Sequence, residues 1–254
     1  MKYWYNKDMA ESSKRIQELL TKEVYSRYEL YDVIYRVYPG YSENSCNWVI
    51  GLLVSDHVLQ PLGNGVFAHW KEPFSYPLDP VSVSLLDKLR ERFPYSDFAG
   101  VTTTSLNEIL MGVDEHKALL LQVSKRDLFP AYLALREWTK REVMLNPTPR
   151  EIEYYLRDNS IILKPLFSKS PVTQDGLYTA EKLLVDLLCD KTLRTMYPYV
   201  SNEDVVQNIC EEKNVNIITT LNYARRRGKY DGMVALFQGV YAPEVLRKVM
   251  EGKE

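Results

Sequence analysis

VLQPLGNGVFAHW, residues 58–70, decides how the N-terminal part of the chain folds. Two short apolar runs, 58–62 and 66–70, flank Gly63-Asn64-Gly65. Asn-Gly between such runs is the strongest short signal for a β-hairpin, because both central residues of the turn tolerate positive φ. We therefore expect two antiparallel strands joined by a tight turn at Asn64.

Three segments with helical periodicity precede this hairpin. The first covers residues 10–20, the second begins with a capping box of Ser26 and Glu29, and the third has Ser42 as its N-cap. Three helices followed by a two-stranded ribbon is the element order of a winged helix. We predict a winged helix-turn-helix domain over residues 1–72. The alternative is a small helical bundle that ends in an ordinary hairpin.

The outer face of the third helix is small and polar, with Ser42, Asn44, Ser45 and Asn47 near its N-terminus. In helix-turn-helix proteins the early residues of this helix meet base edges, and Asn can form two hydrogen bonds with adenine. We expect these four residues to contact DNA. The nearby candidates for phosphate contacts are Lys14, Arg15 and Arg27. The third helix itself has no Lys or Arg, although phosphate contacts usually supply most of the affinity.

The stretch KEPFSYPLDP, residues 71–80, contains three prolines and predicts a linker or strap. We place a second domain at 73–254. Its first half alternates helical segments (83–93, 127–141 and one that starts at Pro149) with extended ones (97–104, 117–123, 142–145 and 160–166). This pattern predicts a mixed sheet with flanking helices. After residue 177 the pattern is entirely helical and indicates a closing helical bundle, so the fold class is α+β.

Composition restricts the class of protein. The chain has 254 residues, 45% of them hydrophobic, and its formal net charge is -2, so any basic surface must be local. No apolar run is long enough for a membrane span, and the N-terminus lacks the apolar core of a secretory signal. We expect a cytoplasmic protein with no membrane association. The three cysteines are widely spaced and indicate buried thiols rather than disulfides or metal ligands.

Catalytic motifs are absent from the sequence. The histidines lie outside any zinc motif, and no P-loop, dinucleotide fingerprint or nucleophile elbow occurs. A strand followed by Lys125 is a partial match to metal-dependent nucleases, but Gln122 and Ser124 stand where a carboxylate is needed. We therefore expect no catalytic residue, no metal site and no cofactor.

The second half of the chain carries one basic cluster, Arg225, Arg226 and Arg227, which closes a helix before Gly228. Cations at the end of a helix also stabilise its dipole, so a helix cap and a binding role are both open. Residues 213–254 contain eight Lys or Arg against four Asp or Glu. This local excess favours nucleic acid over a protein partner.

Several segments, taken in order, resemble the antitoxin of the AbiE abortive-infection type, a bacterial type IV toxin–antitoxin family. They are ELYDVIYRVYP to LGNGVFAHW, VTTTSLNEIL, SIILKPLFSKSPV, EKLLVDLLCD and LNYARRRGK, which span about Tyr25 to Gly239. The resemblance implies a transcriptional repressor whose winged helix binds repeats in the promoter of its own operon. It also implies an antitoxin that counteracts a nucleotidyltransferase-like toxin without a stable complex.

Carried over by position, the resemblance places Ser42, Asn44, Ser45 and Asn47 in the major groove and Asn64 at the tip of the wing. Arg225, Arg226 and Arg227 would extend the positive surface. The alternative function is a protein-interaction adaptor whose winged helix no longer binds DNA and uses Trp48, Tyr31 and Tyr35 as a contact surface.

Overall fold

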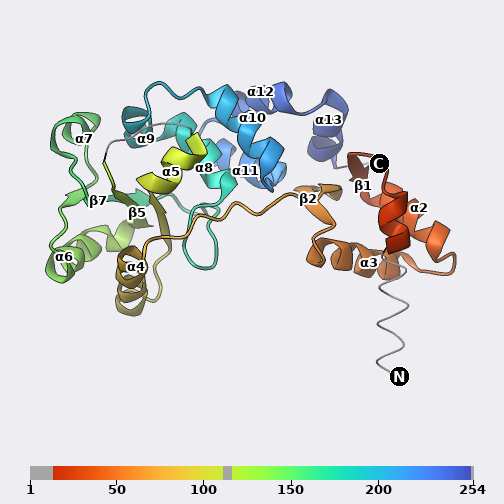
Figure 1. Ribbon diagram of the computed structural model, residues 1–254, viewed down its shortest axis with the longest axis horizontal. Coiled ribbons are helices and arrows are strands. Elements are labelled where there is room, and N and C mark those ends of the chain that lie inside the picture. Colours follow the sequence, from red (N-terminus) through yellow and green to blue (C-terminus); the bar gives the residue numbers. More distant parts are fainter. Residues whose placement is uncertain (1–13, 111–115, 253–254) are drawn as a thin grey trace. The chain divides into compact units, whose positions relative to one another are not determined.

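The structure is a computed structural model that describes residues 14–110 and 116–252 (Figure 1). The chain divides into two compact units. Unit 1 contains the described residues up to Pro73, Glu212–Ile218 and the residues from Val240 onward, and unit 2 contains Phe74–Glu211 and Thr219–Gly239. N-terminal helices with a small antiparallel sheet, a central mixed sheet and C-terminal helices confirm the α+β class.

Unit 1 begins with helices and a small sheet. Residues 14–19 are helical, and the described elements that follow are β1 (Val24–Ser26), α2 (Arg27–Val37), α3 (Glu43–Ser55), β2 (Leu59–Gly63) and β3 (Val66–His69). The three strands are antiparallel in the order β1-β3-β2. The first part of the expected helix 10–20 lies outside the described residues. Strand β1 is three residues long and gives no periodic signal in the sequence, so it was not predicted.

The predicted caps and hairpin of unit 1 are present. Ser26 Oγ accepts the Glu29 N–H at 3.3 Å, and a Glu29 carboxylate oxygen accepts the Ser26 N–H at 2.6 Å. Ser42 caps α3 by accepting the N–H of Ser45 at 3.2 Å. Asn64 and its two flanking glycines all have positive φ, as a tight turn between β2 and β3 requires. The apolar sides of the helices pack on Leu59 and Phe67 to form the core of this unit.

The C-terminal helix α13 (Pro243–Glu251) belongs to unit 1 (Figure 1). From the sequence pattern we expected this helix in the closing bundle of the second domain. The difference has a physical cause, because α13 bonds to residues of the hairpin and of α2 that are about two hundred positions earlier in the chain. Local periodicity cannot report such long-range contacts.

The sheet of unit 2 has the order β4-β5-β7-β6. Its strands are β4 (Phe98–Thr102), β5 (Leu119–Ser124), β6 (Val143–Leu145) and β7 (Ile161–Leu166). Strand β4 is antiparallel to β5, whereas β5, β7 and β6 run parallel. Parallel strands need crossover connections, and α6 and α7 supply them.

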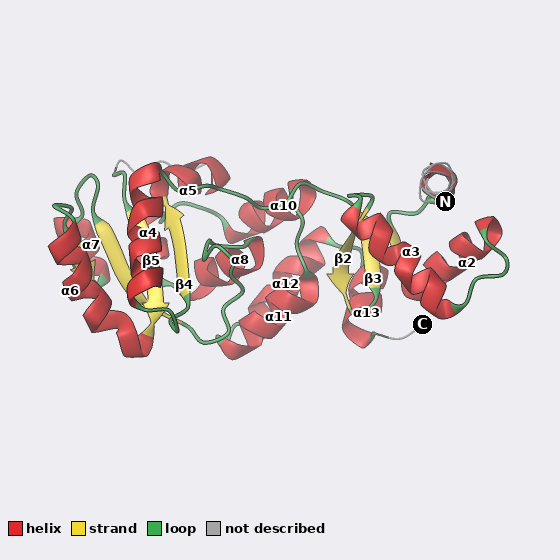
Figure 2. Cartoon of the chain, turned by 90° about the horizontal axis from the view of Figure 1, so that it is seen from below, coloured by secondary structure: helices red, strands yellow, loops and turns green. Residues whose placement is uncertain are grey.

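Unit 2 also contains the helices that flank its sheet and those of its C-terminal helical part (Figure 2). They are α4 (Pro80–Arg92), α5 (Thr103–Leu110), α6 (Leu128–Trp138), α7 (Pro149–Tyr155), α8 (Ala180–Cys189), α9 (Lys191–Met196), α10 (Asn202–Glu212), α11 (Ile217–Arg226) and α12 (Tyr230–Val240). Leucines of α4 and α6 pack with Leu121 and Leu163 on one face of the sheet. On the other face Lys164 bonds to Asp190 and Thr192, at the junction of α8 and α9.

Two details of unit 2 differ from expectation. Strand β4 ends at Thr102, and helix α5 follows at once, where we expected the extended segment to continue to residue 104. Short helix α9 was not predicted, because its six residues do not fill two turns. No helix in the described part of the chain is long and apolar enough to span a membrane.

Candidate nucleic-acid interface

The outer face of α3 presents an amide pair to solvent. Asn44 and Asn47 are exposed one turn apart, and Trp48 beside them is 47% exposed. The opposite side of the same helix is buried in the core of unit 1. This burial fixes the rotation of α3, so the amides stay on the outside.

Tyr31 of α2 orients one of these amides. Its hydroxyl donates to Asn47 Oδ1 at 2.9 Å, while the Tyr31 ring is buried. One lone pair of Oδ1 is therefore used within the protein, and both N–H donors of Asn47 remain available. The adaptor alternative expected Tyr31, Tyr35 and Trp48 as a contact surface, but Tyr31 is buried and Tyr35 half-buried because they pack in the core of unit 1, so of the three only Trp48 is exposed.

The hydroxyls of Ser42 and Ser45 already form hydrogen bonds within the protein at the start of α3. The two hydroxyl oxygens lie 3.0 Å apart, and Ser42 also caps the helix. Ser42 is exposed and Ser45 is half-buried. Contact of these two residues with DNA stays a prediction. In the structure both hydroxyls help to form the N-terminus of α3.

The hairpin tip is in contact with the C-terminal helix of the same unit. Asn64 Nδ2 donates to the carbonyl oxygen of Val249 in α13 at 2.9 Å. Asn64 and Arg27 line one cleft of about 560 Å³, together with Lys248 and Glu251. The structure thus brings together two residues that the sequence analysis selected separately, and adds a second cation, Lys248, that it did not select.

Lys248 also forms an ion pair with Glu29, which lies in the first turn of α2. Its ammonium lies 3.0 Å from a Glu29 carboxylate oxygen, and Lys22 lies 2.8 Å from the same carboxylate. Partial burial would raise the pKa of Glu29, but the hydrogen bonds from Lys22, the Ser26 backbone and Lys248 lower that pKa to about 2. Glu29 therefore stays ionised and holds α13 against α2.

Lys14 and Arg15 lie in the first helix, at residues 14–19, and both are exposed. Neither side chain has a hydrogen bond or ion pair with any residue that the structure describes. They are available for phosphate contacts, which stays a prediction.

The arginine cluster belongs to unit 2, and its three side chains diverge. Arg225 stacks on Tyr230, with its guanidinium carbon 4.3 Å from the ring centroid, and Arg226 donates to the carbonyl oxygen of Ser168. Arg227 turns inward and is 17% exposed. Only Arg225 and Arg226 are exposed, so the cluster is a smaller basic surface than three consecutive arginines suggest.

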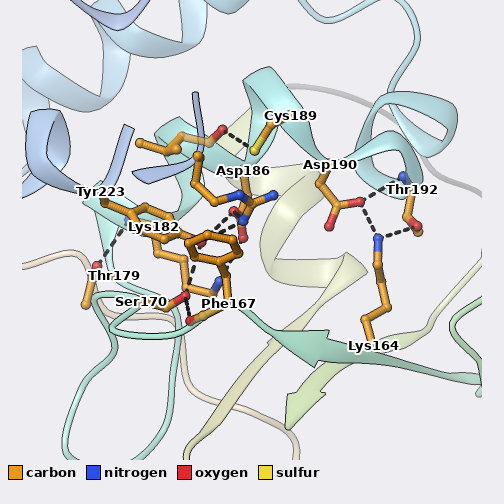
Figure 3. A network of polar contacts seen from close by, with 12 residues as sticks. Lys164, Phe167, Ser170, Thr179, Lys182, Asp186, Cys189, Asp190, Thr192 and Tyr223 are labelled. Atoms are coloured by element: carbon orange, nitrogen blue, oxygen red, sulfur yellow. Dashed lines mark hydrogen bonds and ion pairs between the residues drawn. The ribbon is translucent and has the colours of Figure 1, made fainter. Parts of the chain in front are cut away.

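Asp186 is the centre of a buried ionic network (Figure 3), to which Arg227 also belongs. The Asp186 carboxylate accepts from Lys182 Nζ at 2.8 Å, from Arg227 Nη1 at 2.7 Å and from Tyr223 Oη at 3.0 Å. Lys182 and Asp186 are both fully buried. Burial lowers the pKa of Lys182, and the Asp186 carboxylate opposes that change.

This network is closed to solvent at its centre, so it cannot receive a substrate in this conformation. Lys182 lies 4.6 Å from the ring centroid of Tyr178, which covers it from another side. Burial raises the pKa of Tyr223, so its hydroxyl remains protonated as a donor. We assign the network a structural role in joining α8 to α11. The sequence offered a signal for it, because Lys182 and Asp186 are four residues apart in a helix whose other residues, apart from Glu181, are apolar.

Among the described residues, no group of three or more His, Cys, Asp or Glu side chains is arranged to hold a metal ion. The fold therefore contains an exposed amide face, a cleft with cations at the hairpin tip and a closed ionic core. These features define an α+β protein with a polar helix face in one unit and a buried charge network in the other.

The chain belongs to the DUF6577 family, described as a family of unknown function, whose sequence model matches residues 45–241. No curated protein is significantly similar to the chain.

Proposed function

We propose that the protein is a cytoplasmic, non-enzymatic DNA-binding regulator, and that unit 1 is a winged helix. The observation that carries this proposal is the exposed amide face of α3, placed next to a three-stranded sheet with a tight hairpin. Element order supports the same assignment: a helix, β1, two helices and then the β2–β3 ribbon. In such modules the helix at the position of α3 enters the major groove.

Asn44 and Asn47 are the residues proposed to read base edges. Because Asn47 Oδ1 already accepts from Tyr31, its free donors favour acceptors such as guanine O6 and N7 or thymine O4. Arg27 and Lys248, with the exposed Lys14 and Arg15, would contact phosphates.

The regulator is further proposed to be an antitoxin that represses its own operon and counteracts a nucleotidyltransferase-like toxin. The ordered sequence resemblance from about Tyr25 to Gly239 supports this part of the proposal. Co-expression tests it: the protein should restore growth to cells that express a nucleotidyltransferase-like toxin encoded beside it. Continued growth arrest with the folded protein present would reject the antitoxin role and leave DNA binding to be judged separately.

A fluorescence-anisotropy titration with DNA from upstream of the gene tests the DNA-binding part. We expect saturable binding that weakens at higher salt, because phosphate contacts release counterions. The double variant Asn44→Ala, Asn47→Ala should weaken specific binding by about 5-fold or more, given the roughly 1–3 kcal/mol that a good base contact contributes. Ser55→Ala, at the other end of α3, is the matched control. Equal affinities for the double variant and the control would reject the assigned interface.

The second candidate function is a protein-interaction adaptor. Two observations favour it: α3 contains no Lys or Arg, and large aromatic side chains are exposed, with Tyr28 at 61% and Trp48 at 47%. Aromatic residues of this kind are enriched at protein interfaces. The same titration separates the candidates, because an adaptor would show no specific DNA binding at micromolar protein.

A further inference from the structure

Unit 2 contains a polar cleft of about 370 Å³ at one end of its sheet. It lies where β4 ends, β5 begins and α4 and α5 start. The polar side chains that line it include Ser82, Thr102, Thr104, Lys117, Arg141 and Asn159. None of these residues takes part in the proposed DNA interface, so the cleft is a separate feature of the molecule.

Arg141 is held in a fixed position at this cleft. Its Nη1 donates to Ser82 Oγ at 3.1 Å, and its Nη2 lies 3.5 Å from Asp79 Oδ1. Ser82 in turn donates to the other oxygen of Asp79 at 2.5 Å. The Arg141 side chain is only 17% exposed, so little side-chain entropy remains to be lost on binding a ligand. Two contacts leave several of its five N–H donors unused.

Lys117 supplies the second cation of the cleft. It is exposed, and its ammonium makes no hydrogen bond or ion pair with the residues described, 14–110 and 116–252. The described residues that line the cleft thus include two cations and one carboxylate, that of Asp79, which is an excess of one positive charge among them. Such an excess among fixed donors favours an anion.

The remaining lining groups restrict the anion further. The hydroxyl of Thr104 and the amide of Asn159 can donate to a polar ligand, whereas the described residues that line the cleft include no aromatic ring to stack on a nucleobase. Its volume is in the range of small-molecule sites and exceeds what one inorganic anion needs. We infer that the cleft binds the phosphate group of a small non-aromatic phosphate ester through Lys117 and Arg141.

Isothermal titration calorimetry on the full chain tests this inference. The probes are glycerol 3-phosphate, inorganic phosphate and neutral glycerol, each at constant chloride concentration. We expect saturable binding of both phosphate probes and none of glycerol. Lys117→Gln should weaken binding about 10-fold or more, since it removes a charge-assisted hydrogen bond. Lys88→Gln, at an exposed lysine of α4 outside the cleft, should bind like the parent protein.

Arg141→Gln is a second variant, whose folding is checked by circular dichroism before titration. Absence of saturable binding by both phosphate probes would overturn the inference. It would also be overturned if Lys117→Gln bound as tightly as the parent, because the anion would then be held elsewhere, for example at the cations of unit 1. Neither result depends on DNA binding, so this test is independent of the proposed function.

Discussion

Replacing Asp186 by Asn tests whether the buried network stabilises unit 2. The carboxylate is fully buried and accepts from Lys182, Arg227 and Tyr223 at 2.7–3.0 Å. Asn keeps the volume and one carbonyl acceptor but removes the only anion between two cations. Removal of one partner from a buried ion pair costs about 3–5 kcal/mol, because the remaining charge is left uncompensated. We expect a loss of about 3 kcal/mol or more in the free energy of unfolding.

Lys182→Met should cost less than Asp186→Asn, although it removes the other member of the same pair. In this variant Asp186 still has Arg227 and Tyr223 as partners, and the net charge of the three ionic groups falls from +1 to zero. Urea unfolding is monitored by hydrogen-exchange mass spectrometry. Peptides of α8 then report the unfolding of unit 2 alone. Asp87→Asn, in the exposed pair with Arg90, is the control and should change stability by only about 0.5 kcal/mol. If Lys182→Met proved as destabilising as Asp186→Asn, the charge argument would be wrong.

Two further predictions concern unit 1. Gly63 has a φ of +122°, and a Cβ at this position would lie 2.4 Å from Ile218 Cγ1, so Gly63→Ala should cost about 1–3 kcal/mol. Gly40→Ala, where nothing lies within 4 Å, should be within about 0.5 kcal/mol of the parent in thermal denaturation, and equal losses would refute the reasoning. Folding lowers the pKa of Glu29 from 4.5 to about 2, so its stabilisation is present above pH 4.5 and is lost as the pH falls toward 2. Glu29→Gln should therefore cost about 1–2 kcal/mol at neutral pH and little near pH 2 in a series of urea titrations, and a cost independent of pH would contradict this.

Local signals account for the parts of unit 1 that could be predicted. The caps at Ser26 and Ser42 and the turn at Asn64 depend on residues within three positions of one another, so their physics is visible in a short window. Strand β1 was missed because its three residues become a strand only by pairing with β3, more than forty positions later. The position of α13 was missed for the same reason, since Asn64 and Val249 are separated by 185 residues.

The candidate sites show the same limit. The amide pair of α3 was found because helical periodicity separates its buried and exposed sides. The cleft in unit 2 could not be found, because Lys117 and Arg141 stand in different connections and meet only when the sheet forms. Tyr31 illustrates an intermediate case, in which periodicity predicts a buried ring but cannot supply the partner of its hydroxyl.

The three consecutive arginines show why charge in a sequence does not translate directly into charge on a surface. Successive residues of a helix point about 100° apart, so three neighbours cannot share one face. Arg225 lies on Tyr230, Arg226 reaches the loop at Ser168, and Arg227 enters the core at Asp186. Arg227 is thereby neutralised, and the other two are separated by the helix rotation. A basic patch for nucleic acid needs cations at helical spacing or from several elements; at the hairpin tip Arg27 meets this need, whereas Lys248 is paired with Glu29.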